Sequence, residues 1–339
     1  MSGADLEKVA RALVAPGKGI LAADESSGTI KKRFDSIGVE SNETNRRDYR
    51  EMLFTTKGAA DNISGVILYD ETIRQKASDG TSLVDILKKQ GIIPGIKVDL
   101  GAKTLAKSPE EKVTEGLDGL RERLVEYRDL GAQFAKWRAV ITIGDDIPTP
   151  YCLDVNAHAL ARYAALCQEQ GIVPIVEPEV LMDGNHTIER CYQVTCDTLR
   201  EVFDQLYEQR VEFEGMLLKP NMVLPGKENR TAPPEEVAQA TIRCFNTVVP
   251  AAVPGIVFLS GGQGDEEATA NLNAMNKLGP HPWQLSFSYG RALQAPALKA
   301  WKGDKANFEA GQRAYLHRAR CNGAARSGDY TEKMESSAA

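Results

Sequence analysis

The chain is 339 residues long, with 41 basic and 47 acidic residues and a formal net charge of −6. Nucleic-acid binding and attachment to anionic membranes usually need a basic surface, so this balance argues against both, whereas a small anionic substrate needs only a local basic group. The apolar share of 42% is ordinary for a globular protein, and no apolar run approaches the roughly 20 residues of a membrane helix or resembles a signal peptide. The six cysteines form no CxxC pair, so we expect free thiols and a reducing, cytoplasmic location.

Eight short apolar runs along the chain predict β-strands. Their apolar residues are almost continuous instead of alternating, which is typical of parallel strands that are buried on both faces. The runs cover residues 19–24, 64–70, 92–99, 134–142, 172–179, 214–222, 255–262 and 283–289.

The segments between these runs predict helices. Apolar residues recur with helical spacing over 153–167, and similar patterns cover 192–206 and 268–278. Eight strands alternating with helices favour a single α/β domain, a (β/α)8 TIM barrel, over a doubly wound open sheet. We expect the barrel and an N-terminal helix to occupy residues 1–321, and residues 322–339 to form a tail that is mobile or docked.

Polar residues at the strand ends are the candidate site, because active sites of this fold lie at the C-terminal ends of the strands. A single residue of this kind is commonly a strand end that reaches water or a salt-bridge partner, but a converging set is expensive to bury without a function. In strand order the candidates are Asp24, Lys97, Asp99, Lys136, Arg138, Glu177, Glu179, Lys219, Ser260, Gly261, Gly262 and Arg291.

Lysines together with carboxylates favour imine chemistry. A lysine amine can attack a carbonyl to form an imine, which withdraws electrons from the neighbouring carbon. Burial of Lys219 and a second ammonium at Lys136 would both favour the uncharged amine that this attack needs. Glu177, on the strand between them, is placed to move protons.

Two regions predict anion binding. The Ser260-Gly261-Gly262 turn precedes a helix, so its N–H groups and Arg291 could hold a phosphate, although glycine pairs also mark ordinary turns. Lys32 and Arg33 form a second basic group after the first strand. This group is either a second anion site or the solvent-exposed face of a helix. Two anion sites beside an imine-forming lysine would suit a substrate that is phosphorylated at both ends.

No motif for a metal or a nucleotide is present. The four histidines are scattered, and the sequence has no HExxH, Walker A or GxGxxG motif opening the first helix, so we expect no cofactor. The cysteines are expected to be core or surface thiols, because none lies at a predicted strand end beside a histidine.

Seven motifs in this order resemble class I fructose-1,6-bisphosphate aldolase from about residue 10 to residue 319. They are GILAADES, GIKVD, FAKWR, IVPIVEPE, LLKPNMV, FLSGGQ and FSYGRALQA. The resemblance implies reversible, metal-free cleavage of fructose 1,6-bisphosphate into dihydroxyacetone phosphate and glyceraldehyde 3-phosphate in glycolysis and gluconeogenesis. It also implies a cytoplasmic homotetramer.

The resemblance further implies individual roles. Lys219 would form the imine with the C2 ketone, Glu177 would be the acid/base of imine formation, and Lys136 would support the charge changes. Asp24 would interact with the C4 hydroxyl. The remaining matches are the C1-phosphate site (Ser260, Gly261, Gly262, Ser288, Gly290, Arg291), the region of the other phosphate and the hydroxyls (Ser26, Lys32, Arg33, Lys97), and the supporting residues Glu179 and Arg138.

The chain departs from the family pattern in places. Leu100 stands where many members have a lysine, Gly264 replaces a serine, and Thr29 takes a serine position. Many members end in a tyrosine that assists proton transfer at C3, whereas the last tyrosine here, Tyr330, lies in a different context. We do not transfer that role to Tyr330. Either the chemistry of the tail differs here, or another group or water moves that proton.

Two alternative functions stay open from the residues alone. One is an imine-forming aldolase of the same fold that acts on a different sugar phosphate. The other is a scaffold that has lost catalysis and binds partner proteins through its acidic surface.

Overall fold

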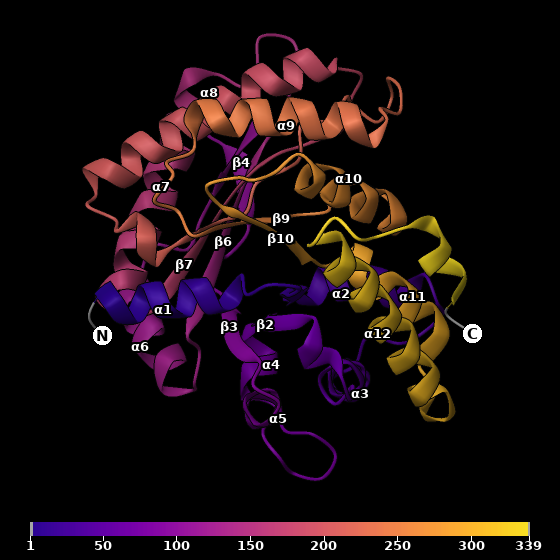
Figure 1. Cartoon of the computed structure of the whole chain (residues 1–339). Coiled ribbons are helices and arrows are strands. Elements are labelled where there is room, and N and C mark those ends of the chain that lie inside the picture. The colour runs from indigo at the N-terminus through magenta and orange to yellow at the C-terminus, as the bar shows by residue number, and fades with distance from the viewer. Residues whose placement is uncertain (1–2, 338–339) are drawn as a thin grey trace.

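A closed barrel of eight parallel strands forms the centre of the protein, seen in a computed structural model that describes residues 3–337 (Figure 1). The eight strands coincide with the eight predicted runs, so the predicted TIM barrel is confirmed. Around the barrel the order is β1, β2, β3, β6, β7, β8, β9 and β10, and β10 closes onto β1. Their bounds are Gly19–Ala23, Ile63–Leu68, Ile93–Lys97, Phe134–Ile141, Val173–Val180, Leu217–Leu218, Gly255–Phe258 and Gln284–Tyr289.

Helices surround the barrel and connect its strands (Figure 1). They run from α1 to α12 as Gly3–Leu13, Ser27–Asp35, Glu43–Phe54, Asp70–Arg74, Leu83–Lys89, Leu120–Asp129, Pro150–Glu169, Ile188–Glu208, Pro234–Val248, Asp265–Lys277, Arg291–Trp301 and Phe308–Ala325. Short 3-10 turns cover Ala59–Asp61, Phe213–Gly215, Lys305–Asn307 and Glu332–Ser337. The predicted helices 153–167, 192–206 and 268–278 lie in α7, α8 and α10.

Threonine caps set the starts of the long helices α7 and α8. The side chain of Thr149 accepts a hydrogen bond from the N–H of Cys152 at 3.1 Å, and Pro150 follows it as the first helical residue. The side chain of Thr187 accepts in the same way from the N–H of Arg190 at 3.2 Å. Each cap satisfies an N–H group that has no partner inside its helix, so these helices begin where the sequence supplies the hydroxyl.

Two apolar cores lie on the two sides of the barrel wall. The larger one fills the space between the strands and the helices, and the smaller one fills the amino-terminal half of the barrel. Leu6, Ala10 and Leu13 of α1 belong to the smaller core, so α1 closes the amino-terminal end. Gly95 lies against the ring of Phe134, where a Cβ atom would come within 2.3 Å of it. Side chains fill the amino-terminal end of the barrel, so a substrate can bind only at the carboxyl ends of the strands.

An antiparallel hairpin between β3 and α6 was not predicted. It consists of β4, Ala102–Leu105, and β5, Ser108–Thr114. Most of its residues are polar and few are buried, so no apolar run marks it in the sequence. Glu111 anchors the hairpin, because its buried carboxylate accepts hydrogen bonds from the N–H and the hydroxyl of Thr149 at 2.7 and 2.8 Å.

The C-terminal segment is docked, which decides between the two predicted alternatives. Helix α12 runs through the expected junction at residue 322 and ends at Ala325, and the division of the chain into barrel and tail stays a prediction. Beyond it, the buried Tyr330 donates from its hydroxyl to Glu335 at 2.7 Å and from its N–H to Asn273 of α10 at 3.0 Å. Glu335 also pairs with the buried Arg318 of α12. None of the described helices has the length and apolar character to cross a membrane.

Candidate active site

A cavity of about 250 Å³ opens at the carboxyl ends of the barrel strands. It brings together residues that are up to 269 positions apart in the chain, from Ala22 to Arg291. Fourteen of the predicted site residues line it: Asp24, Ser26, Arg33, Lys97, Lys136, Arg138, Glu177, Glu179, Lys219, Ser260, Gly261, Ser288, Gly290 and Arg291. Ten of the twelve residues predicted from strand ends therefore lie in one site.

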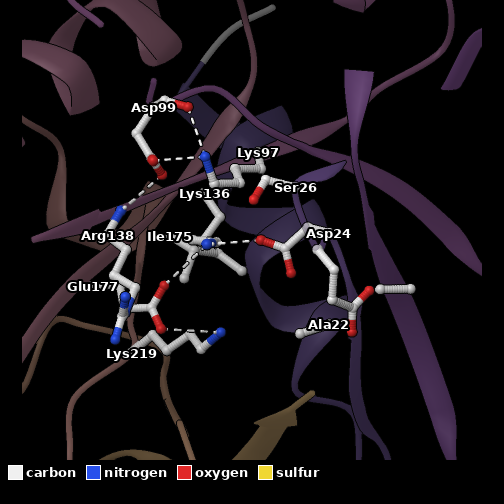
Figure 2. Close-up of polar contacts among 12 residues, drawn as sticks. Ala22, Asp24, Ser26, Lys97, Asp99, Lys136, Arg138, Ile175, Glu177 and Lys219 are labelled. Atoms are coloured by element: carbon white, nitrogen blue, oxygen red, sulfur yellow. Dashed lines mark hydrogen bonds and ion pairs between the residues drawn. The ribbon is translucent and has the colours of Figure 1, made fainter. Parts of the chain in front are cut away.

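Four of these side chains form a continuous chain of charge contacts (Figure 2). Lys136 Nζ lies 2.7 Å from Asp24 Oδ2 and 3.3 Å from Glu177 Oε2, and Lys219 Nζ lies 3.2 Å from Glu177 Oε1. Lys136 and Glu177 lie within β6 and β7, Asp24 and Lys219 directly follow β1 and β8, and both lysines are 4% exposed. Charged groups this deeply buried are tolerated because each ammonium has a carboxylate partner.

Strand geometry explains why these particular residues face inward. Side chains of a strand alternate between its faces, so Lys136 and Arg138 of β6 share one face, as Glu177 and Glu179 of β7 do. Lys219 directly follows the two-residue strand β8, and its N–H still donates to the carbonyl of Val176 at 2.8 Å. That backbone bond extends the pairing of β8 with β7 and places the lysine beside Glu177.

The charge contacts set the ionisation of two groups. Burial raises the pKa of Asp24, but the ammonium groups of Lys136 and Lys219 outweigh burial and lower it to about 2. Burial lowers the pKa of Lys136, but the carboxylates of Asp24 and Glu177 outweigh it and hold that pKa well above its usual value. At neutral pH Asp24 is therefore a carboxylate and Lys136 an ammonium.

Asp99 and Glu179 fix the neighbouring basic groups. Lys97 Nζ contacts Asp99 Oδ1 at 2.6 Å and the Asp99 carbonyl at 2.7 Å, and the N–H of Arg138 donates to Asp99 Oδ2 at 3.2 Å (Figure 2). Arg138 Nε donates to Glu179 Oε2 at 2.5 Å. The ends of β3, β6 and β7 are thus joined by charge-assisted bonds, which hold Lys97 at the edge of the cavity.

Glu25 is a site residue that the sequence reasoning did not select. Its buried carboxylate contacts Arg33 Nη1 at 2.5 Å and Arg50 Nη2 at 3.0 Å, and it accepts from Gln294 Nε2 at 2.8 Å. Arg50, 2% exposed on α3, was missed as well. The only signal for Glu25 is its place in the AADES motif beside Asp24, and the signal for Arg50 is a charge on the apolar face of its helix.

The turn after β9 and the start of α11 form the other side of the cavity. Arg291, the first residue of α11, donates from Nη2 to the carbonyls of Gly261 at 3.2 Å and Gln263 at 2.8 Å. Gly261 has a φ of +54°, a conformation that favours glycine. The buried hydroxyl of Ser288 has no hydrogen-bond partner among the described residues. A helix N-terminus, a guanidinium and a hydroxyl converge here, which is an arrangement that binds phosphate.

Three predicted residues do not line the cavity, and one of them, Asp99, lines the neighbouring cavity instead. Lys32 is exposed on α2, because successive helix residues point about 100° apart and its neighbour Arg33 takes the inward direction. Gly262 is turned away, since its N–H donates to the Sδ of Met182 at 3.1 Å. Thr29, where many relatives of the suggested family have serine, does line the cavity, and its hydroxyl lies 3.2 Å from that of Ser26.

A second, larger cavity of about 630 Å³ adjoins this site along the end of β3. It shares Ser26, Lys97 and Arg138 with the first cavity. Leu100, at the position of a lysine in many family members, also lines it and is 63% exposed. The four groups of the Asp24–Lys219 chain line the smaller cavity and not this one, so the smaller cavity is the candidate active site.

Three possible metal ligands meet away from this cavity, on α12 and the tail. One ligand atom each of His317, Cys321 and Glu335 lies within 4.8 Å of the others. The scattered positions of the histidines do not predict this cluster, because it forms only where the tail brings Glu335 to His317. The Glu335 carboxylate already pairs with Arg318 and accepts from Tyr330, so its charge has a partner.

Lysines and carboxylates buried together at the mouth of a TIM barrel define a class of enzyme, the lysine-dependent aldolases. The family model described as "Glycolytic: Fructose-bisphosphate aldolase class-I" matches residues 5–339. The chain belongs to this class I fructose-bisphosphate aldolase family of carbon–carbon lyases, whose general mechanism is a lysine Schiff base.

Curated relatives and a solved structure agree with this membership. The chain is 59% identical over 332 residues to "Probable fructose-bisphosphate aldolase class 1" of Xanthomonas axonopodis pv. citri, covering 97% of this chain and 99% of the relative. It is 56% identical over 329 residues to fructose-bisphosphate aldolase 1 of Toxoplasma gondii, covering 96% and 91%. A structure of Plasmodium falciparum fructose-bisphosphate aldolase, in complex with TRAP and a small-molecule inhibitor, superposes with a TM-score of 0.96 at 51% identity, covering 97% and 96%.

Proposed function

We propose that the smaller cavity binds fructose 1,6-bisphosphate and that Lys219 forms the Schiff base with its C2 ketone. The observation that carries this assignment is the placement of Glu177, which contacts Lys219 on one side and Lys136 on the other. A carboxylate in contact with the attacking amine can move the protons that imine formation and hydrolysis require.

The contacts distinguish Lys219 from Lys136 as the nucleophile. Lys136 is paired with two carboxylates, Asp24 and Glu177, which stabilise its ammonium form. Among the described residues, Lys219 is paired with Glu177 alone. Because only an uncharged amine can attack a carbonyl, the lysine with fewer carboxylate partners is the better nucleophile. Lys136 would serve as the fixed positive charge that balances the two acids.

The reaction then follows from the chain of contacts. Glu177 takes a proton from the ammonium group of Lys219, and the resulting amine attacks C2 to give a carbinolamine. Glu177 then returns that proton to the departing hydroxyl, so that water leaves as the protonated imine forms. The protonated imine withdraws electrons from C3, so the C3–C4 bond breaks while the Asp24 carboxylate takes the proton of the C4 hydroxyl. Glyceraldehyde 3-phosphate leaves, the remaining enamine is protonated at C3, and hydrolysis releases dihydroxyacetone phosphate.

The two phosphates would orient the substrate across the barrel mouth. Ser260, Gly261, Ser288, Gly290 and Arg291 are proposed to hold the C1 phosphate at the N-terminus of α11. Ser26, Arg33 and Lys97 line the opposite side and are proposed to hold the other phosphate and the hydroxyls. Fixing both ends places C2 at Lys219 and lowers the entropic part of the barrier.

The assembly and location are also proposals. The protein is proposed to be a cytoplasmic homotetramer that needs no metal, as the family resemblance implies. Light scattering after size-exclusion chromatography should give about four times the 37.0 kDa of one chain. A mass of one or two chains would contradict the tetramer.

Borohydride reduction in the presence of dihydroxyacetone phosphate tests the central assignment. Reduction traps the imine as a stable secondary amine, and peptide mass analysis should locate it on Lys219. Lys219→Arg should abolish the adduct and lower kcat by at least about 1,000-fold, because a guanidinium is not a nucleophile. Cleavage by the unmodified enzyme should be unchanged in a chelator.

The control is Lys227→Arg, which changes an exposed lysine paired with Asp183 near the same turn. This variant should keep both the adduct and the activity. An adduct on another lysine, or activity that needs a divalent metal, would refute the assignment. Comparing cleavage of fructose 1,6-bisphosphate, fructose 1-phosphate and sedoheptulose 1,7-bisphosphate would identify an aldolase with a different sugar preference.

A further inference from the structure

Two cysteines from neighbouring outer helices lie in direct contact. The Sγ atoms of Cys196 on α8 and Cys244 on α9 are 3.0 Å apart. Both are free thiols, with 3% and 0% of their surfaces exposed. Helices α8 and α9 pack side by side on the outside of the barrel (Figure 1). The proposed aldolase mechanism uses neither thiol.

We propose that Cys196 and Cys244 are an oxidation site, at which a peroxide converts the two thiols into a disulfide that joins α8 to α9. A disulfide bond is about 2.05 Å long, so the two sulfur atoms need to approach by about 1 Å. Rotations of the two side chains can supply such a movement without separating the helices. The pair is 48 residues apart in the chain, so the bond would close a long loop.

The surroundings of the pair select Cys196 as the attacking sulfur. The hydrogen bond with Cys244 is the largest influence on the pKa of Cys196. Together with Tyr192 and Arg200 it outweighs burial and holds that pKa below the ordinary value of a thiol. The pKa of Cys244 is raised, first by the same hydrogen bond and then by burial. Cys196 is therefore the thiol that ionises first, and it is also the one with some solvent contact.

The reaction has two displacement steps. The Cys196 thiolate attacks one peroxide oxygen, which forms an S–O bond, breaks the O–O bond and releases hydroxide that becomes water with the thiol proton. Cys244 then loses its proton and attacks the sulfenic sulfur, so the S–S bond forms, the S–O bond breaks and a second water leaves. The two sulfurs lose two electrons in total, and one hydrogen peroxide takes them up.

The bond would connect the two helices that hold the segment after Lys219. Asn221 Nδ2 donates to the hydroxyl of Thr195 on α8 at 3.1 Å, and the N–H of Val223 donates to the hydroxyl of Thr241 on α9 at 2.9 Å. Thr195 directly precedes Cys196, and Thr241 lies one helical turn before Cys244. A disulfide between the helices would therefore stabilise this part of the barrel against unfolding.

Peptide mapping of the full chain after hydrogen peroxide treatment, without reductant, tests the site. We expect one cross-link between the peptides of Cys196 and Cys244, lighter by two hydrogens and reversed by dithiothreitol. Thiol titration in urea should fall from the six cysteines of the chain to four. Cys196→Ser and Cys244→Ser should each abolish the cross-link. The matched control Cys167→Ser, at a buried thiol of α7 outside the pair, should keep it.

Two results would overturn the proposal. One is a pair that stays reduced while peroxide oxidises other cysteines of the same sample, and the other is a cross-link between different cysteines, such as Cys191 and Cys196. A second measurement needs no variant: the oxidised wild-type chain should unfold at a temperature roughly 5 °C higher than the reduced chain, and dithiothreitol should reverse the difference. An unchanged or lower midpoint would refute the stabilising role of the bond.

Discussion

Glu25 organises one side of the active site without facing the reacting carbon. Its carboxylate binds Arg33 at the cavity and Arg50 in the interior, and Gln294 links it to the hydroxyl of Tyr49. Arg33 is thus fixed in place before a phosphate arrives. A flexible arginine would lose more entropy on binding, so this anchoring favours substrate affinity.

Glu25→Gln should therefore weaken binding more than chemistry. Without the carboxylate, Arg33 is no longer held by a charge-assisted bond, and we expect KM for fructose 1,6-bisphosphate to rise on the order of tenfold while kcat changes less than about threefold. Steady-state kinetics measure both. Glu71→Gln, which removes the pairing with Arg46 away from the cavity, is the control and should leave KM unchanged. A fall in kcat as large as the rise in KM would contradict the positioning role.

The charge state of Asp24 depends on its neighbours. Its pKa of about 2 in the folded state lies below the ordinary 3.8, so ionised Asp24 stabilises the fold by about 2 kcal/mol. Because the folded pKa is the lower one, this stabilisation is complete above about pH 4 and is lost as the pH falls towards 2. The stability gap between wild type and Asp24→Asn should narrow over that range in urea unfolding. Asp35→Asn, at an exposed i,i+4 pair, should show no such trend.

At the scale of elements, the connection from β9 to α10 is held by backbone and amide groups. The buried Gln263 donates from its N–H and Nε2 to the Ser260 carbonyl, and it accepts from Asn271 of α10 at 2.6 Å. Gly264 is the N-cap of α10 with φ −65° and ψ 162°, and it offers no side-chain cap. Only half of a capping box is present, the bond from the Gly264 N–H to Glu267.

Gly264→Ser should stabilise the protein by about 0.5–1 kcal/mol. The serine hydroxyl can accept from a free N–H of the first turn, and a non-glycine residue in a conformation it readily adopts loses less entropy on folding. Gly261→Ala is the opposite control, because its φ of +54° should make the substitution destabilising by about 1 kcal/mol. Chemical denaturation measures both. A destabilised Gly264→Ser variant would contradict this reading of the cap.

At the scale of the whole molecule, the segments near the two ends of the chain pack on different parts of the domain, α1 on the barrel interior and the described part of the tail on outer helices. Helix α1 fills the amino-terminal end with apolar side chains. The tail packs on α10 and α12, where Glu335 pairs with Arg318, an arginine that is 2% exposed and also donates to the carbonyl of Asp265 at 3.1 Å. Tyr330 serves this docking through its bond to Glu335, which agrees with leaving the C3 proton transfer to another group.

Glu335→Gln should destabilise the fold and leave catalysis intact. Arg318 would keep its buried charge without its carboxylate, at a cost of about 3 kcal/mol in the free energy of unfolding. Because Glu335 does not line the cavity, kcat should stay within about twofold. The exposed neighbour Glu332 provides the control Glu332→Gln, which should change neither property. If Glu335→Gln lowered kcat strongly and left the stability unchanged, the prediction would be wrong and the tail would take part in catalysis.

The sequence by itself determined the barrel and most of the site. The eight apolar runs are continuous because parallel strands are buried on both faces, so even the short strand β8 was found. The strand-end rule then selected Asp24, Lys136, Glu177 and Lys219, since a parallel barrel places every strand end on one side.

Only the tertiary structure decided what depends on neighbours far apart in the chain. The hairpin β4–β5 has no apolar run, Arg50 and Glu25 meet only when α3 folds against β1, and Arg33 faces the cavity while Lys32 does not. The contact between Cys196 and Cys244 arises in the same way, from the packing of α8 on α9. Periodicity records which face of an element is buried, but the partner of a buried charge or thiol is fixed by the packing of other elements.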